Sequence, residues 1–195
     1  MQNSPDNIKL VTTGSLATQR LLKTVDDLLD IAKLEAGKFG YQFQEGDIVA
    51  FLDKLLLDAE RVAAAYNVHV YFEHEGMATL PLTFDPQRLG VAVANLLDNA
   101  IKYNVPNGTV TVRLERFGTE PYVSLSIQDT GVGIPKEAMN KLFTKFFRAE
   151  NVVKFVTEGS GLGLYLVKNI ILRHGGKISV ESVLNRGTKF TIKLP

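Results

Sequence analysis

One segment of the chain carries amide and ammonium side chains at a spacing that suits a metal-phosphate group. Asn95, Asn99 and Lys102 stand at positions i, i+4 and i+7, so on a helix they share one stripe. An amide oxygen can bind a hard cation such as Mg²⁺, and a lysine ammonium can meet a phosphate. A solvated polar helix face would also explain these three residues. The spacing alone leaves both interpretations open.

Asp129 follows the alternating run 122–128 and precedes Gly131 and Gly133. A carboxylate at the end of an interior strand is costly to bury unless it accepts strong hydrogen bonds, and an adenine amino group is one such donor. The two glycines would let a flat ring approach the backbone closely, and Ile134 would give it an apolar wall. An ordinary Asx-turn is the alternative interpretation of this Asp-x-Gly-x-Gly pattern.

A glycine run, Gly-Ser-Gly-Leu-Gly-Leu at 159–164, leads into a segment expected to be helical. Free N–H groups at a helix N-terminus bind anions, so phosphate is the expected ligand. The run is not a Walker A loop, because no Gly-Lys-Ser/Thr follows. It also differs from the Rossmann fingerprint, because the glycines are spaced G-x-G-x-G and follow a polar loop instead of a strand.

Three phenylalanines, Phe143, Phe146 and Phe147, stand just before Arg148, between Asp129 and the glycine run. Beside a polar loop such residues can be core, and we expect this of Phe143 and Phe146. Arg148, at the edge of the loop, could pair with a terminal phosphate.

Composition excludes several classes of protein. A chain of 195 residues that is 45% hydrophobic can bury one substantial core with an appendage. The net charge of +1 gives no reason to expect nucleic acid as a partner. The absence of cysteine excludes disulfides and thiolate chemistry and suits a reducing cytosol. Apolar runs fall far short of the roughly 18 residues that cross a membrane.

Residues 1–37 are expected to form a long helix. Apolar residues recur at Leu21, Val25, Leu28 and Ala32, the seam of a helix that must bury this face against another element. Gly37 would end it. Residues 38–46 then form a linker with a short strand at 41–44.

Residues 47–195 mix helices and strands as one domain. Helices are expected at 47–66 and 85–103, capped by Asp47 and Asp85, and at 135–142 and 161–173. Strands are expected at 68–73, 80–84, 109–117, 122–128, 177–182 and 188–194, with a polar loop at 148–160. Hairpins instead of βαβ crossovers join the strands. The predicted fold is α+β, a two-layer sandwich whose mixed sheet is covered on one face by helices, preceded by the long N-terminal helix.

Together these motifs resemble the N, first glycine, F and second glycine boxes of sensor histidine kinases. They occur in the family's order and spacing over residues 46–195: Asn95…Asn99-x-x-Lys102-Tyr103, Asp129-x-Gly131-x-Gly133, Phe143-x-x-Phe146-Phe147-Arg148 and Gly159-x-Gly161-x-Gly163. Residues 22–38 resemble the second helix of that family's dimerisation hairpin.

The resemblance implies a role for each motif in a site for ATP and Mg²⁺. Asp129 would read the adenine amino group, Asn99 would ligate Mg²⁺, and Arg148 would approach the γ-phosphate. Asn95 and Lys102 would face the phosphates and, with Arg148, act in catalysis. Residues 149–158 would form a mobile lid. The other implied nucleotide-binding residues are Tyr103, Gly131, Gly133, Ile134, Phe147, Gly159, Ser160, Gly161, Leu162, Gly163, Leu164 and Thr188.

The resemblance also implies a reaction and partners. The γ-phosphoryl would pass from ATP to a histidine on the hairpin and from there to a response regulator receiver domain. The full protein would be a homodimer through the N-terminal helix, located in the cytoplasm as a free protein or as the cytoplasmic part of a membrane-bound sensor.

The sequence departs from the family pattern at the phosphoacceptor. His69, His74 and His174 are the chain's histidines, and none lies in a His-Glu-x-x-x-Thr-Pro-like motif. We expect all three to be structural. The chain is therefore expected to begin after the first hairpin helix and to be unable to phosphorylate itself.

Three other classes of protein compete with this assignment. Related ATPases, such as type II topoisomerases, place a glutamate general base where this chain has Asn95, and an amide serves water activation poorly. Anti-sigma serine kinases share the pocket, but the long N-terminal helix argues against them. A nucleotide-independent interaction module would require all four motifs to be coincidental.

Overall fold

The computed structural model describes residues 5–116, 122–155 and 159–195, which group into two units, Met1–Gly40 and Tyr41–Pro195. The division falls inside the segment predicted to be a linker. Within the described ranges, no helix has both the length and the apolar character that a membrane span requires.

The first unit is built on one long helix, α1 (Pro5–Glu35), as the apolar seam predicted. The helix ends in a Schellman motif, in which the N–H of Lys38 donates to the carbonyl of Lys33 and that of Gly37 to Leu34, at 2.7 and 3.1 Å. Gly37 adopts φ +66°, which glycine accepts without strain. Large apolar side chains on α1 are exposed at Leu21, Leu22, Val25, Leu28 and Leu29.

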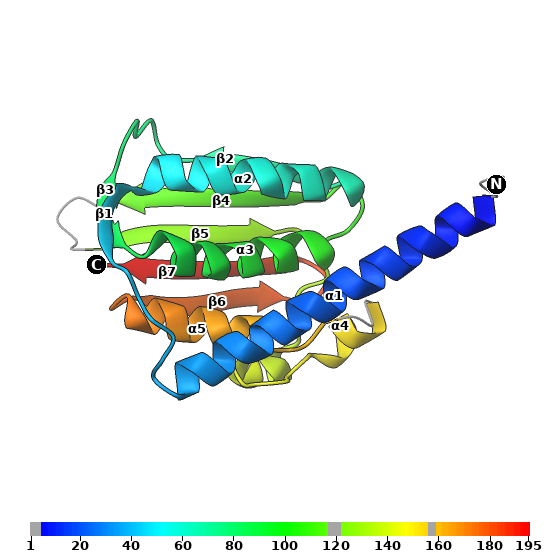
Figure 1. The fold of residues 1–195 in the computed structure, drawn as a ribbon. Coiled ribbons are helices and arrows are strands. Elements are labelled where there is room, and N and C mark those ends of the chain that lie inside the picture. The colour runs from blue at the N-terminus through cyan, green and yellow to red at the C-terminus, as the bar shows by residue number, and fades with distance from the viewer. Residues whose placement is uncertain (1–4, 117–121, 156–158) are drawn as a thin grey trace. The chain divides into compact units, whose positions relative to one another are not determined.

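The second unit contains a five-stranded mixed sheet, in the order β2-β4-β5-β7-β6, and a two-stranded sheet of β1 and β3 (Figure 1). The strands are β1 (Gln44–Asp47), β2 (His69–Glu73), β3 (Pro81–Phe84), β4 (Thr109–Arg116), β5 (Val123–Asp129), β6 (Lys177–Val183) and β7 (Gly187–Leu194). The helices are α2 (Ile48–Ala65), α3 (Pro86–Lys102), α4 (Glu150–Phe155) and α5 (Gly163–Arg173), with a 3₁₀ turn, η1, at Lys136–Lys141.

Helices α2, α3 and α5 cover one face of the sheet, and the apolar core lies between the two layers (Figure 1). The alternation of β4 sends Val110, Val112 and Leu114 into this core. Leu96 of α3 and Leu166 of α5, in the helical layer, are fully buried. The α+β fold class is thereby confirmed.

Two of the predicted helix caps are present. Asp47 accepts a hydrogen bond from the N–H of Val49 at 3.0 Å and opens α2. Asp85 accepts one from the N–H of Arg88 at 2.9 Å and opens α3. Both are N-cap bonds that satisfy donors in the first helical turn.

The strand predicted at 41–44 is wrong, because β1 begins only at Gln44. The rings of Tyr41 and Phe43 stack on each other with centroids 5.8 Å apart, and Phe43 meets the His174 ring edge-on at 4.9 Å. The backbone N–H of Gln42 donates to Asp85 Oδ2 at 2.6 Å. These side-chain contacts, instead of a strand partner, fix the segment.

The expectation that only hairpins join the strands is also wrong. Strand β2 pairs with β4 in parallel, with β3 and α3 between them in the chain. Because β3 pairs with β1 outside the main sheet, the chain returns through α3 and makes a crossover.

The polar loop predicted at 148–160 contains a helix, α4. Glu150 lies in its first turn, where the helix dipole favours a carboxylate. A helix this short carries too few residues to display an apolar period. Part of the predicted lid, 156–158, lies outside the described residues.

Candidate functional site

Helix α3 presents its polar stripe away from the core, as predicted. Leu96, Leu97 and Ile101 are buried, whereas Asn95, Asn99 and Lys102 are half-buried. Asn95 Nδ2 donates to the carbonyl of Val91 at 2.9 Å, which orients the amide.

The start of α5 lies against this stripe. A β-carbon added to Gly163 would meet Asn95 Oδ1 at 2.7 Å, closer than such contacts occur, so the amide would have to shift to admit any other residue. The glycine run and the amide stripe are far apart in the sequence but lie next to each other in the structure.

Asp129 ends the central strand β5 and is 8% exposed. The N–H groups of Gly131 and Thr188 donate to its Oδ1 at 2.8 and 3.1 Å. Burial raises the pKa of Asp129 to about 6, and the two backbone hydrogen bonds offset only part of this rise. The bond from Gly131 is the Asx-turn considered as an alternative, but it uses Oδ1 and not Oδ2.

The glycines after Asp129 have a packing role that the sequence did not predict. A β-carbon on Gly131 would collide with the carbonyl oxygen of Tyr103, and one on Gly133 would collide with that of Val183. Gly133 also has φ +64°. The expectation that these glycines admit a ligand stays a prediction, since the protein's own backbone already requires both.

Tyr103, the C-cap of α3, joins this loop to the second glycine run. Its carbonyl accepts from the N–H of Val132 at 3.0 Å, and Lys102 Nζ lies 5.7 Å from its ring centroid. A β-carbon on Gly159 would lie 3.6 Å from the Tyr103 hydroxyl and 3.5 Å from Arg148 Nε. Tyr103, Arg148 and Gly159 therefore lie close together.

The N-terminus of α5 has the form expected of an anion site. Its N-cap is Leu162, which is buried and makes no side-chain capping bond. Ser160 Oγ accepts from the N–H of Leu162 at 3.3 Å, just outside the helix. A leucine side chain cannot accept hydrogen bonds, so the N-cap residue leaves the first N–H groups of α5 without a cap from its own side chain. Leu164, in this turn, is half-buried.

Sequence reasoning missed two side chains that hold this site together. Ser182 Oγ accepts from the N–H of Ile134 at 2.9 Å and lies 3.0 Å from Thr188 Oγ1. Asn151 Nδ2, on α4, donates to the carbonyl of Gly133 at 2.8 Å. Nothing in the local sequence marks Ser182, since only its pairing with Thr188 across the β6–β7 hairpin brings it here.

The phenylalanine segment divides differently from expectation. Phe143 is half-buried and meets the Phe190 ring edge-on at 6.5 Å, while Phe147 and Arg148 are half-buried. Phe146 is 66% exposed, so its prediction as a core residue is wrong. Its backbone is left-handed, with φ 62°.

The histidines have structural surroundings or lie at the surface. His174 is buried, accepts at Nε2 from the N–H of Asp85 at 3.1 Å and has Nδ1 2.8 Å from the Ile170 carbonyl. His74 Nδ1 lies 2.8 Å from the carbonyl of Met77. His69 is exposed on β2.

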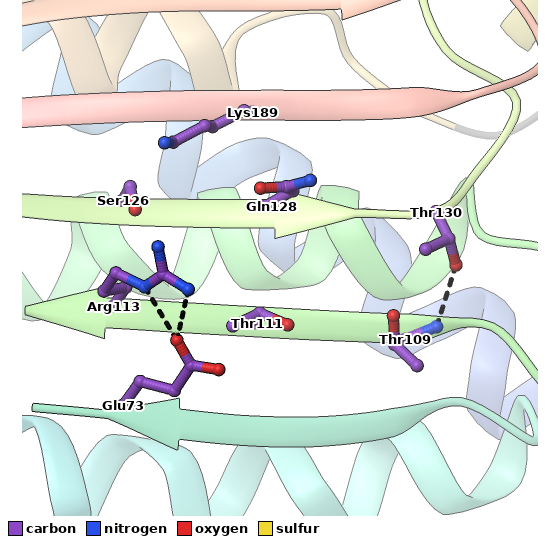
Figure 2. A pocket seen from close by; sticks show the side chains of 8 residues that line it. All are labelled: Glu73, Thr109, Thr111, Arg113, Ser126, Gln128, Thr130 and Lys189. Atoms are coloured by element: carbon purple, nitrogen blue, oxygen red, sulfur yellow. Dashed lines mark hydrogen bonds and ion pairs between the residues drawn. The ribbon is translucent and has the colours of Figure 1, made fainter.

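The open face of the sheet carries a separate polar hollow of about 210 Å³ (Figure 2). Arg113 of β4 pairs there with Glu73 of β2, Nε to Oε2 at 2.7 Å. The hollow includes none of the predicted site residues; it is lined by Glu73, Thr109, Thr111, Arg113, Ser126, Gln128, Thr130 and Lys189.

Comparison with known proteins shows which family this chain resembles. Residues 84–195 match the family described as histidine kinase-, DNA gyrase B- and HSP90-like ATPase. The sensor protein SrrB of Staphylococcus aureus is 33% identical over 98% of this chain and 32% of its own length. The chain thus spans about a third of that curated relative.

Two solved structures share the fold. The mycobacterial sensor histidine kinase MprB is 32% identical, with a TM-score of 0.67 over 79% of this chain and 97% of that one. The histidine kinase ThkA in complex with the response regulator TrrA is 25% identical, with a TM-score of 0.76 over 100% of this chain and 53% of that one. The chain therefore belongs to this ATPase family and contains the histidine-kinase-like ATPase domain found in sensor kinases.

Proposed function

We propose that the second unit binds ATP with Mg²⁺ and transfers the γ-phosphoryl group to a histidine on an acceptor helix, as part of a longer sensor kinase. One observation carries the proposal: four motifs separated in sequence meet through glycine contacts. Gly163 lies against Asn95, Gly131 against Tyr103, and Gly159 against Arg148 and Tyr103.

Asp129 would recognise the base. Its Oδ1 is occupied by two backbone donors, so Oδ2 would accept from the adenine amino group. With a pKa of about 6, the carboxyl is mostly ionised at neutral pH and can accept. Tyr103, Ile134 and Thr188 would line the ring, and Ser182 contacts the last two.

The phosphates would lie at the N-terminus of α5. Its N–H groups, the Lys102 ammonium and the Arg148 guanidinium would neutralise their charge, and Asn95 would face them from α3. Asn99 offers one amide oxygen to Mg²⁺, so phosphate oxygens and water would complete the shell, as this ion prefers. Bound there, Mg²⁺ would draw charge from the leaving phosphates.

The reaction needs no protein base that activates water. A nitrogen of the acceptor imidazole would attack the γ-phosphorus while the bond from that phosphorus to the β–γ bridging oxygen breaks, and ADP would leave. Asn95 cannot take a proton from water, which disfavours hydrolysis. The protein's contribution is position and charge.

Partners follow from the same assignment. The ThkA complex with TrrA supports a response regulator as the recipient of the phosphoryl group. The exposed apolar side chains of α1 support homodimer formation through this helix. A site of action in the cytoplasm belongs to the same proposal.

Calorimetry with a non-hydrolysable ATP analogue and Mg²⁺ tests the proposal. Wild type should bind the analogue, and Asn99→Ala should bind it about tenfold more weakly. EDTA should weaken binding of the analogue to wild type by a similar factor, and binding to the variant by less. No binding by wild type would sink the proposal, and steady hydrolysis of ATP would favour a superfamily ATPase over a histidine kinase.

A further inference from the structure

Asn104, just after the end of α3, is a buried amide that joins three segments of the second unit. Its side chain donates from Nδ2 to the carbonyls of Ala100 and Thr109 at 3.1 and 3.0 Å. Its Oδ1 accepts from the N–H of Val105 at 2.9 Å and from the hydroxyl of Thr130 at 3.1 Å. These bonds use both donors and both acceptor positions of the amide. The end of α3, the start of β4 and the loop after β5 are therefore held together at one side chain.

Thr130, the partner of Asn104 in that loop, lies between Asp129 and Gly131 in the turn that orients the Asp129 carboxylate. Its Oγ1 accepts from the N–H of Thr109 at 2.8 Å, the bond drawn at the right of Figure 2. Its own N–H donates back to the Thr109 carbonyl at 3.2 Å. Thr130 lines the hollow on the open face of the sheet, whereas Asp129 is buried. The turn that carries the carboxylate is therefore anchored at its middle residue.

The same network reaches the helix that is proposed to hold the phosphates. Asn104 bonds to the carbonyl of Ala100, in the last turn of α3, which lies between Asn99 and Lys102 in the sequence. The turn at Asp129 and the polar stripe of α3 are thus connected through one amide. A nucleotide must engage both ends of the site at once, so its binding depends on the distance between them.

We propose that Asn104 and Thr130 are positioning residues that set the distance between the base-reading carboxylate of Asp129 and the phosphate-binding stripe of α3. This inference rests on the proposed function. The two residues act through the turn at Asp129, as hydrogen-bonded supports that fix the geometry of a binding site. A ligand that occupies only the phosphate end does not depend on this distance. The network therefore matters for a whole nucleotide and not for a triphosphate without a base.

Thr130→Val tests the proposal, because it removes the hydroxyl and keeps the shape of the side chain. Thr130 is exposed, so the freed N–H of Thr109 can reach water, and the thermal midpoint should fall by less than about 5 °C. Calorimetry should show affinity for the non-hydrolysable ATP analogue with Mg²⁺ reduced about tenfold. Affinity for inorganic tripolyphosphate with Mg²⁺ should stay at the wild-type value. Thr130→Ser retains the hydroxyl and should restore most of the affinity for the analogue.

Thr111→Val is the matched control, because Thr111 lines the same hollow on β4 but is not part of the network. It should bind both ligands like wild type. Equal affinity of wild type and Thr130→Val for the analogue would overturn the positioning role. A parallel loss of both ligands in Thr130→Val would also overturn it, because it would indicate general damage to the fold. Failure of wild type to bind the analogue would instead contradict the proposed function.

Amide hydrogen exchange in wild type supplies a measurement that does not depend on any variant. The N–H of Thr109 donates to Thr130 Oγ1, so its exchange reports opening of the network. The two ligands are compared at equal occupancy, at which each stabilises the whole fold by the same amount. The ATP analogue should then slow exchange at Thr109 several-fold more than tripolyphosphate does. Equal slowing by both ligands, or none by either, would overturn the proposal.

Discussion

Gly163 and Asn95 lie in contact across two helices, with room for an amide oxygen and none for a methyl group: a β-carbon on the glycine would stand 2.7 Å from Asn95 Oδ1. Moving the Asn95 amide aside would break the hydrogen bond from its Nδ2 to the carbonyl of Val91. This contact joins the amide stripe to the glycine run.

Gly163→Ala should therefore fold yet bind the ATP analogue about tenfold more weakly, because the methyl group displaces Asn95 and the start of α5. Calorimetry measures the affinity, and circular dichroism the fold. Gly90→Ala is the control: its β-carbon would lie 3.8 Å from the Phe51 ring, so it should stabilise α3 by about 0.5–1 kcal/mol and leave affinity unchanged. Equal affinities in both variants would contradict the contact's role.

Asp129 should make stability fall as pH rises. Its folded pKa of about 6 lies above the usual value of 3.8, so the folded state binds the proton more tightly than the unfolded state. Stability from this group is therefore greatest below about pH 4 and is lost up to about pH 6, by roughly 3 kcal/mol. Urea unfolding of wild type and Asp129→Asn across this range checks it, and a constant difference between the two would contradict it.

Affinity for the ATP analogue should change with pH in the opposite direction. Protonation of Asp129 places a hydrogen where the adenine amino group must donate, so binding should weaken below about pH 6. Asp129→Asn should bind weakly at every pH, because its amide cannot reproduce both the two backbone bonds and a free acceptor. Calorimetry at pH 5 and pH 7.5 measures this, and a wild-type affinity that does not change would argue against base recognition by this carboxyl.

Ser182→Ala should destabilise the second unit by about 1–3 kcal/mol, because the N–H of Ile134 loses its acceptor. Ser179→Ala, at an exposed position of the same strand, should change stability by less than about 0.5 kcal/mol. Urea unfolding compares them. Similar losses in both variants would show that Ser182 has no special role.

The full chain should self-associate through α1. Light scattering after size-exclusion chromatography should give a mass near twice 21.5 kDa, whereas residues 41–195 should run as a monomer. The shorter chain should begin at Tyr41, because Gln42 bonds to Asp85 and belongs to the second unit. A monomeric mass for both the full chain and the shorter chain would contradict dimer formation through this helix.

Local signals were sufficient to predict most of the elements. The caps at Asp47 and Asp85, the helix stop at Gly37 and the β6–β7 hairpin each depend on a few adjacent residues, and all are present. Long-range contacts were not predictable in this way. The parallel β2–β4 pairing depends on where β3 finds its partner, and the Tyr41–Phe43 segment depends on His174, far along the chain.

The candidate site also divides into features with a local sequence signal and features that depend on long-range contacts. The resemblance predicts that Asn95, Asp129 and the glycine run serve one ligand, and this stays a prediction. The packing reasons for individual glycines came only from the structure. Gly131 is required by the carbonyl of Tyr103 and Gly133 by that of Val183. The left-handed backbone of Phe146 was unpredictable, because a bulky residue rarely adopts it.

Strand β5 is the innermost strand of the sheet, and Asp129 is its last residue. Amide hydrogens of such a strand exchange with solvent last, whereas a short peripheral helix such as α4 exchanges early. The residue proposed to select the base is therefore expected to lie on a slow-opening part of the molecule, and α4 is expected to open sooner. Nucleotide identity would be decided by a rigid element, whereas the contact of α4 with Gly133 would break and re-form more often.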